Sequence, residues 1–132
     1  MNSTIKIFIL AGEKSGDNHG ASLMHAIKKQ SNDRVEFIGI GGVQMKEKGL
    51  NSIVDLDKMA VMGFLEVFKK ILFFINLKKK IINLIKSENP DKIILIDYPG
   101  FNLHLAKKIK NFFSTPIYYY ISPQIWAWKE KR

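Results

Sequence analysis

The chain has 132 residues, of which 46% are hydrophobic, so it is suited to one domain with a buried core, and a disordered chain is excluded. It has no cysteine, which excludes disulfides and thiolate metal sites, and its three histidines, His19, His25 and His104, show no paired ligand spacing. The 21 Lys and Arg against 12 Asp and Glu give a net charge of +9, which favours nucleic acid, anionic lipid or phosphorylated substrates. A codon bias that inflates lysine would contribute to the same charge, so the charge alone does not choose a partner.

Strand and helix patterns alternate along the first half of the chain. Residues 5–10, IKIFIL, predict a strand, and residues 19–30 carry apolar side chains at helical spacing. Residues 35–40, VEFIGI, predict a second strand, and the segment 43–49, VQMKEKG, predicts a short helix that ends at its glycine. A short strand is expected over residues 52–54.

The same alternation continues in the second half. Residues 92–97, KIILID, predict a strand, residues 103–113 a helix, and residues 116–122 a last strand. The strands are apolar throughout and the linkers are short, which indicates a parallel sheet covered on both faces. The sequence therefore predicts a single doubly wound α/β domain.

The segment 63–88 predicts an unusual amphipathic helix. Its first half has one apolar face and its second half another, rotated by roughly a third of a turn or more, so a break or kink is expected near residues 73–76. The second stripe, which we expect to dock on the sheet, is Leu77, Ile81, Leu84 and Ile85. The first stripe is expected to face more core, a partner subunit or, because lysines flank it, an anionic lipid surface. This first stripe consists of Phe64, Val67, Phe68, Ile71, Leu72 and Ile75.

No segment predicts secretion or a membrane span. The apolar residues 5–12, IKIFILAG, are too short and too soon followed by Glu13 and Lys14 to form a signal peptide. No run approaches the roughly 18 apolar residues that a membrane-spanning helix needs. We therefore expect a cytoplasmic protein.

The loop after the first strand, AGEKSGD, is a candidate anion site. Gly12 and Gly16 precede a helix, so backbone N–H groups there could hold an anion. The spacing matches neither a Walker loop nor GxGxxG. An equally good interpretation is that Asp17 or Asn18 caps the helix.

Two other loops carry weaker signals. Gly41 and Gly42 close the second strand, which by itself indicates a tight turn. Trp126 and Trp128 could line a sugar or lipid site, although aromatic pairs more often serve packing. The sequence stops soon afterwards, where an α/β domain would normally add strands, so an incomplete module is expected.

Asp97 is a stronger candidate for a functional residue than those in the other loops. It follows the apolar run Ile93 to Ile96, so we expect a carboxylate directly at the end of a strand that is buried on both faces. An acid in such a low-dielectric site retains a proton more readily than in water, which suits a general base near neutral pH. A purely structural role for Asp97 is the alternative.

The residues after Asp97 are expected to hold it outward. Pro99 is expected to restrict Tyr98 to extended geometry, and Gly100 to let the loop turn sharply. Asn102 then precedes the helix and is the better candidate for its cap. With the cap supplied by Asn102, Asp97 would not be drawn back towards the helix.

Five segments occur in the order and spacing of one enzyme family: AGEKSGD, GIGGVQM, VMGFLEV, IDYPGFN and YISPQIWAWKEKR. From about Ile5 to Arg132 the chain closely resembles the N-terminal half of the lipid-A-disaccharide synthases of bacteria. This resemblance implies an inverting glycosyltransferase with one Rossmann-like half of a GT-B fold. Its reaction joins UDP-2,3-diacylglucosamine to 2,3-diacylglucosamine 1-phosphate and releases UDP, and it implies neither a catalytic metal nor a cofactor.

The resemblance also implies roles for individual residues. Asp97 matches the acid of the family's ID-x-P motif, whose implied role is general base on the 6-hydroxyl of the acceptor. Gly100 stands where a second acid often follows the proline in this family, so two acids are not available in this loop. The other matched residues are expected to shape the substrate pocket: Ser15, Gly16, Asp17, Gly41, Gly42, Glu66, Asn102, Ser122, Gln124 and Trp126.

The resemblance further implies partners and a location. The C-terminal half of the family holds most UDP contacts and has no counterpart in residues 1–132, so these residues are expected to form one acceptor-side domain that is inactive alone. The expected partners are the UDP-sugar lipid donor, the phosphorylated acceptor, the missing half and an anionic membrane. The helix from Phe64 to Ile75 falls where the family is thought to touch the inner face of the inner membrane of Gram-negative bacteria.

Two other classes of function compete with the enzyme. The first is a non-catalytic module that binds a membrane surface or the acceptor lipid. The second is a nucleic-acid binder driven by the charge of +9, but the sequence contains no recognised reading motif and its aromatic residues do not interleave with a basic stripe. A nucleic-acid partner is therefore not expected.

Overall fold

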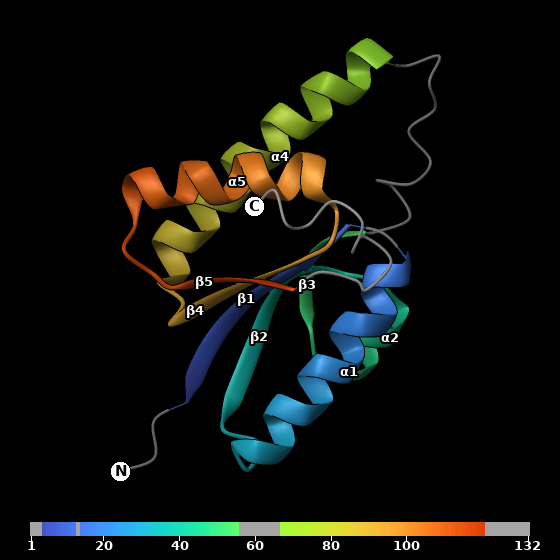
Figure 1. Cartoon of the computed structure of the whole chain (residues 1–132), viewed down its shortest axis with the longest axis vertical. Helices are drawn as coiled ribbons and strands as arrows, with labels where there is room; N and C mark the ends of the chain where they lie inside the picture. The colour runs from blue at the N-terminus through green and yellow to red at the C-terminus, as the bar shows by residue number, and fades with distance from the viewer. Residues whose placement is uncertain (1–3, 13, 56–66, 121–132) are drawn as a thin grey trace, which may run out of the picture.

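The computed structural model describes residues 4–12, 14–55 and 67–120 of the chain. They form a five-stranded parallel sheet in the order β3-β2-β1-β4-β5, with helices on both faces (Figure 1). The predicted doubly wound α/β fold is thereby confirmed.

The helices and strands alternate as the sequence predicts. The strands are β1 (Ile5–Ala11), β2 (Val35–Gly41), β3 (Asn51–Asp55), β4 (Lys92–Ile96) and β5 (Ile117–Tyr120). The helices are α1 (Lys14–Gln30), α2 (Val43–Glu47), α4 (Val67–Glu88) and α5 (Pro99–Phe112). Helices α1 and α5 begin earlier than their apolar periodicity indicates, at residue 14 rather than 19 and at residue 99 rather than 103.

The core has two layers, one on each face of the sheet. Successive side chains of a strand point to opposite faces, so Ile7 and Ile9 of β1 pack under α1 and α2, whereas Phe8 and Leu10 pack under α4 and α5. All four side chains are almost completely buried. Since both faces are covered, every position of the central strands must be apolar, which explains their unbroken hydrophobic runs.

Helix α4 is continuous for 22 residues, so a break near residues 73–76 is wrong, and the alternative of a kink there stays a prediction. Its second half docks on the sheet as predicted, because Leu77, Ile81 and Ile85 are buried. The first half extends past the sheet in Figure 1, and Ile75 is 43% exposed. One helix therefore does not need to bury both stripes in one groove. None of the helices described is long and apolar enough to span a membrane.

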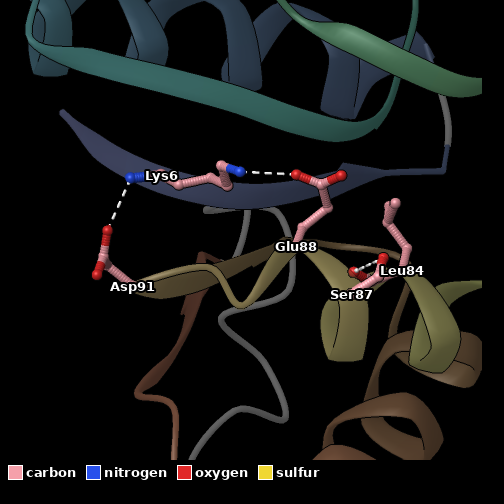
Figure 2. Close-up of polar contacts among 5 residues, drawn as sticks. All are labelled: Lys6, Leu84, Ser87, Glu88 and Asp91. Carbon is pink, nitrogen blue, oxygen red and sulfur yellow. Dashed lines mark hydrogen bonds and ion pairs between the residues drawn. The ribbon is translucent and has the colours of Figure 1, made fainter.

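The amino-terminal edge of the sheet is fixed by polar contacts around Lys6, shown in Figure 2. The N–H of Lys6 donates to Asp91 Oδ2 at 2.8 Å, and its carbonyl accepts from the N–H of Asp91 at 2.7 Å. The Lys6 Nζ pairs with Glu88 Oε1 at 2.7 Å (Figure 2). These contacts join the start of β1 to the end of α4 and the start of β4.

Gly39 lets β2 approach β1. Its φ is +141°, and a Cβ at this position would overlap the carbonyl oxygen of Ile9. Glycine alone adopts this geometry without steric cost. By contrast, a Cβ added at Gly100 in α5 would meet no atom within 4 Å.

The Lys6–Glu88 pair predicts a pH-dependent stability. The hydrogen bond to Glu88 raises the pKa of Lys6 above the ordinary lysine value of 10.5. A raised folded-state pKa gives stability that is present below pH 10.5 and is lost as the pH rises through the folded value. We expect Glu88→Gln to lower the melting temperature slightly at pH 7, and this difference to shrink above pH 10.5. Glu47→Gln, at an exposed glutamate, is the control, and a difference that persists at alkaline pH would refute the ion-pair origin.

Substitution by alanine is expected to have opposite effects on stability at Gly39 and at Gly100. Gly39→Ala should lower the free energy of unfolding by about 2–5 kcal/mol, because strain and overlap with β1 add together. Gly100→Ala should raise it by about 0.5–1 kcal/mol, because alanine is the better helix former and has room. Urea denaturation of both variants measures the difference. Equal effects would contradict the close approach of β2 to β1.

Candidate functional site

The candidate site lies where the strand order reverses. β1 pairs with β2 on one side and with β4 on the other, which makes the carboxyl ends of β1 and β4 a topological switch point. Ala11 at the end of β1 pairs with Ile96 at the end of β4. Gly12 and Asp97 therefore leave the sheet as neighbours. Ligands of doubly wound folds bind at such a point.

A tight turn of two residues connects β4 to α5. β4 ends at Ile96 and α5 begins at Pro99, so Asp97 and Tyr98 alone reverse the chain, with φ of +45° and +51°. Left-handed geometry costs a non-glycine residue about 1–3 kcal/mol. The extended Tyr98 that we expected is wrong, because an extended residue would carry the chain onward instead of into the helix. Gly100, expected to make the turn, lies inside α5.

The backbone of Asp97 is held on both sides. Its N–H donates to the carbonyl of Tyr120 at 2.9 Å, which continues the pairing of β4 with β5. Its carbonyl accepts from Asn102 Nδ2 at 2.8 Å and from the Tyr119 hydroxyl at 3.0 Å. The expectation that Asn102 caps the helix is wrong, because Asn102 lies within α5 and its side chain points back to the end of β4. The Asp97 side chain is partly buried.

Aromatic rings line one side of this turn. The ring of Tyr98 lies against Gly12, so closely that a Cβ at Gly12 would overlap it. Tyr98 also contacts Phe74 of α4 and Phe101 of α5, with ring centroids 6.3 and 6.1 Å apart, and all three side chains are partly buried. The need for glycine at position 12 is thus explained by ring packing.

Asp17 stabilises a helix other than its own. α1 begins at Lys14, so Asp17 and Asn18 lie inside it, and the expectation that either caps α1 is wrong. Asp17 is only 6% exposed, and its carboxylate accepts from three amides at the start of α2. These are the N–H groups of Gly42, Gln44 and Met45, at 2.9, 3.1 and 3.0 Å. A carboxylate at a helix N-terminus is favourable because it meets unsatisfied donors and the positive end of the dipole.

The other glycines of the predicted pocket serve close packing. A Cβ at Gly16 would lie 3.2 Å from the Cβ of Ala11, and one at Gly41 would press on Met45 and Leu50. Ser15 in the first turn of α1 is exposed. The structure thus brings Asp97 and Asn102 together, whereas Asp17, Gly41 and Gly42 belong to the junction of α1 with α2.

Several predicted residues lie outside the described part of the chain. These are Phe64, Glu66, Ser122, Gln124, Trp126 and Trp128. Four residues of the first apolar stripe belong to α4, but their side chains are also outside the description: Val67, Phe68, Ile71 and Leu72. Their predicted roles stay predictions.

Tyr98, Tyr119 and His19 were missed by sequence reasoning. Tyr98 and Tyr119 contact Gly12 and the Asp97 carbonyl respectively, as described above. His19 of α1 contacts the ring of Tyr120, with centroids 5.9 Å apart. The signals were present, because His19 closely follows the AGEKSGD segment and every second residue of an IYYY strand shares a face.

An open cavity of about 560 Å³ lies away from the switch point. Its described lining consists of His25, Lys28, Lys29, Asp33, Glu47 and Lys48. The turn that precedes β2 contributes to it, so it belongs to the amino edge of the sheet. Among residues 4–12, 14–55 and 67–120, no cluster of His, Asp or Glu is suited to holding a metal ion.

Comparison with known proteins agrees with this geometry. The family model described as lipid-A-disaccharide synthetase matches residues 7–132. The lipid-A-disaccharide synthase of Syntrophus aciditrophicus is 47% identical over 135 residues, which cover 100% of this chain and 34% of that protein. The enzyme of Idiomarina loihiensis is 44% identical over 99% of this chain, and lipid-A-disaccharide synthase 1 of Legionella pneumophila (strain Lens) 42% identical over 100% of it. The chain spans about a third of the length of these curated relatives. With residues 7–132 matched by the family model, its parallel sheet and its acid at the switch point, the chain belongs to the lipid-A-disaccharide synthetase family.

Proposed function

We propose that this chain is the acceptor-side part of a lipid-A-disaccharide synthase. The reaction joins UDP-2,3-diacylglucosamine to 2,3-diacylglucosamine 1-phosphate and releases UDP. Membership of the family supports the reaction, and one observation carries the mechanism: Asp97 leaves β4 at the switch point, on a turn whose backbone is held at both sides.

Asp97 acts as the general base in this proposal. Its carboxylate takes the proton of the acceptor's 6-hydroxyl while that oxygen attacks the anomeric carbon of the donor. The new bond forms as the bond from the anomeric carbon to UDP breaks, so the configuration inverts. A sharp turn between a strand and a helix suits this task, because in α/β-hydrolases the same arrangement exposes the reacting residue at the top of the sheet.

The donor requires more protein than residues 1–132 supply. The relatives are about three times as long as the matched part, and the proposed reaction takes place between two halves of a GT-B fold. We assign the UDP contacts to the region that corresponds to their remaining length. Residues 1–132 alone are then expected to lack transferase activity, because proximity of donor and acceptor is lost.

The first half of α4 is proposed to touch an anionic membrane, on the inner face of the inner membrane. It extends past the sheet, and Ile75 on its apolar stripe is exposed (Figure 1). Lys78, Lys79 and Lys80 follow on the same helix and would meet lipid phosphates. The same observation supports the second candidate function, a non-catalytic membrane-binding module.

Asp97 and Asp91 provide a matched pair at opposite ends of β4. The test protein joins residues 1–132 to the remaining two thirds of the Syntrophus aciditrophicus relative. Asp97→Asn should lower kcat by about 10²–10⁴-fold, because it removes the base but keeps the shape. Asp91→Asn should turn over like the parent, since the amide oxygen still accepts from Lys6. Near-normal turnover of Asp97→Asn would remove Asp97 from the mechanism, and absence of turnover in the parent protein would favour the binding module.

Vesicle flotation tests the membrane contact. The triple variant Phe68→Ser, Leu72→Ser, Ile75→Ser should bind vesicles containing anionic phosphatidylglycerol at least about tenfold more weakly, because it loses three apolar side chains. Phe112→Ser is the control, since Phe112 is 66% exposed but lies at the end of α5. Equal losses in both proteins, or no loss in the triple variant, would reject α4 as the contact.

A further inference from the structure

We propose that Asn102 and Tyr119 are positioning residues of Asp97, an inference that rests on the proposed role of Asp97 as base. Both side chains donate to the carbonyl oxygen of Asp97, at 2.8 and 3.0 Å. Together they keep Asp97 and Tyr98 in the left-handed turn, and this turn fixes the direction in which the Asp97 carboxylate leaves the strand.

The carbonyl of Asp97 needs donors from side chains. Among the described residues, the last backbone hydrogen bond between the end of β4 and β5 runs from the N–H of Asp97 to the carbonyl of Tyr120. After it the chain turns left-handed, so the carbonyl of Asp97 is carried away from the strand ladder. A partly buried carbonyl without a donor would be costly, and the turn would relax towards a geometry in which water reaches it. Asn102 and Tyr119 donate hydrogen bonds to this carbonyl and so stabilise the turn.

Asn102 is suited to this role by its amide group alone. Its side chain is completely buried, and Nδ2 donates to the carbonyls of Ile96 and Asp97 at 3.2 and 2.8 Å. Two adjacent acceptors demand an NH₂ group, which also fixes which way the amide points. Among the described residues, Oδ1 has no hydrogen-bond partner, so the residue is needed for its donors. An aspartate of the same shape would place a carboxylate oxygen against two carbonyl oxygens.

Tyr119 reaches the turn because of its place in β5. Tyr119 pairs with Leu95, and both belong to the layer under α4 and α5. The neighbouring Tyr118 and Tyr120 point to the opposite face and are 51% and 40% exposed. One tyrosine of the three therefore supplies its hydroxyl to Asp97. Tyr118 provides a control that has the same chemistry and lies in the same strand, with its side chain on the opposite face.

A purely structural role makes a different prediction from a positioning role. If the two donors only add stability, their loss lowers the melting temperature, while the pH dependence of kcat/KM and the value of kcat stay those of the parent. If the two donors orient the Asp97 carboxylate, their loss lowers kcat with little change in KM. It also shifts the acidic limb of the pH profile, because the surroundings of the Asp97 carboxylate change.

The test uses the full-length chimera of residues 1–132 with the remainder of the Syntrophus aciditrophicus relative. Tyr119→Phe should lower kcat about fivefold, the effect of one neutral hydrogen bond, and shift the acidic limb of the pH profile. Tyr118→Phe should match the parent in both. Asn102→Asp should lower kcat by about 100-fold, because the turn it holds is displaced. If Asn102→Asp does not fold, the kcat and the pH profile of Tyr119→Phe alone test the positioning role.

Two measurements separate this inference from the base proposal. In the Asp97→Asn background, Tyr119→Phe should have no further effect on kcat, because the carboxylate that Tyr119 positions is already absent. NMR ¹³Cα shifts of residues 97 and 98 should move in Tyr119→Phe and not in Tyr118→Phe. Loss of activity in Asp97→Asn with parent-like kcat, pH profile and shifts in Tyr119→Phe would overturn the positioning role and leave the base. Normal activity of Asp97→Asn would overturn the base itself.

Discussion

The parallel pairing of β1 with β4 is the constraint on which the rest of the molecule depends. It places the strands at the centre of the sheet, where both faces are covered by helices and only apolar side chains fit. It also makes the two strands end together, at Ala11 and Ile96. The first residue after β4 is Asp97, which lies outside both core layers and leaves the sheet beside Gly12. An acid follows the most hydrophobic strand because that is where the core ends and the switch point begins.

Two carboxylates near this edge have different surroundings, and the difference separates structure from chemistry. Asp17 is buried and is engaged by three amides of α2, so it completes a helix terminus. Asp97 is partly exposed, and both its backbone N–H and its backbone carbonyl are hydrogen-bonded. These backbone hydrogen bonds fix the position of Asp97 at the switch point. Such an arrangement suits a group whose oxygens must accept a proton from a substrate.

The sequence predicted the strands, which depend on local residue pattern, and missed the features that depend on contacts between distant segments. All five strands and the position of Asp97 at the end of the apolar run were predicted, because a strand covered on both faces must be apolar and the run stops where burial stops. The geometry of Tyr98 was wrong, because pre-proline preference is overridden when α5 starts at Pro99 and the Tyr98 ring packs on Gly12. The partner of Asp17 was missed because it lies 25 to 28 residues away, at the start of α2. The continuity of α4 was missed because helical periodicity does not show where the sheet ends.

The direction of α4 determines where a membrane would lie relative to the proposed base. α4 precedes β4 and runs antiparallel to it, so the first residues of α4 lie at the same edge of the sheet as the end of β4. The part of α4 that extends past the sheet, with Ile75 exposed, is thus at the edge where β4 ends (Figure 1), and Phe74 of α4 contacts Tyr98, the neighbour of Asp97. A substrate whose sugar is attached to acyl chains must keep the chains in an apolar phase while its hydroxyl reaches the base. Since one topology places both features at one edge, a lipid surface at α4 would present the sugar towards Asp97.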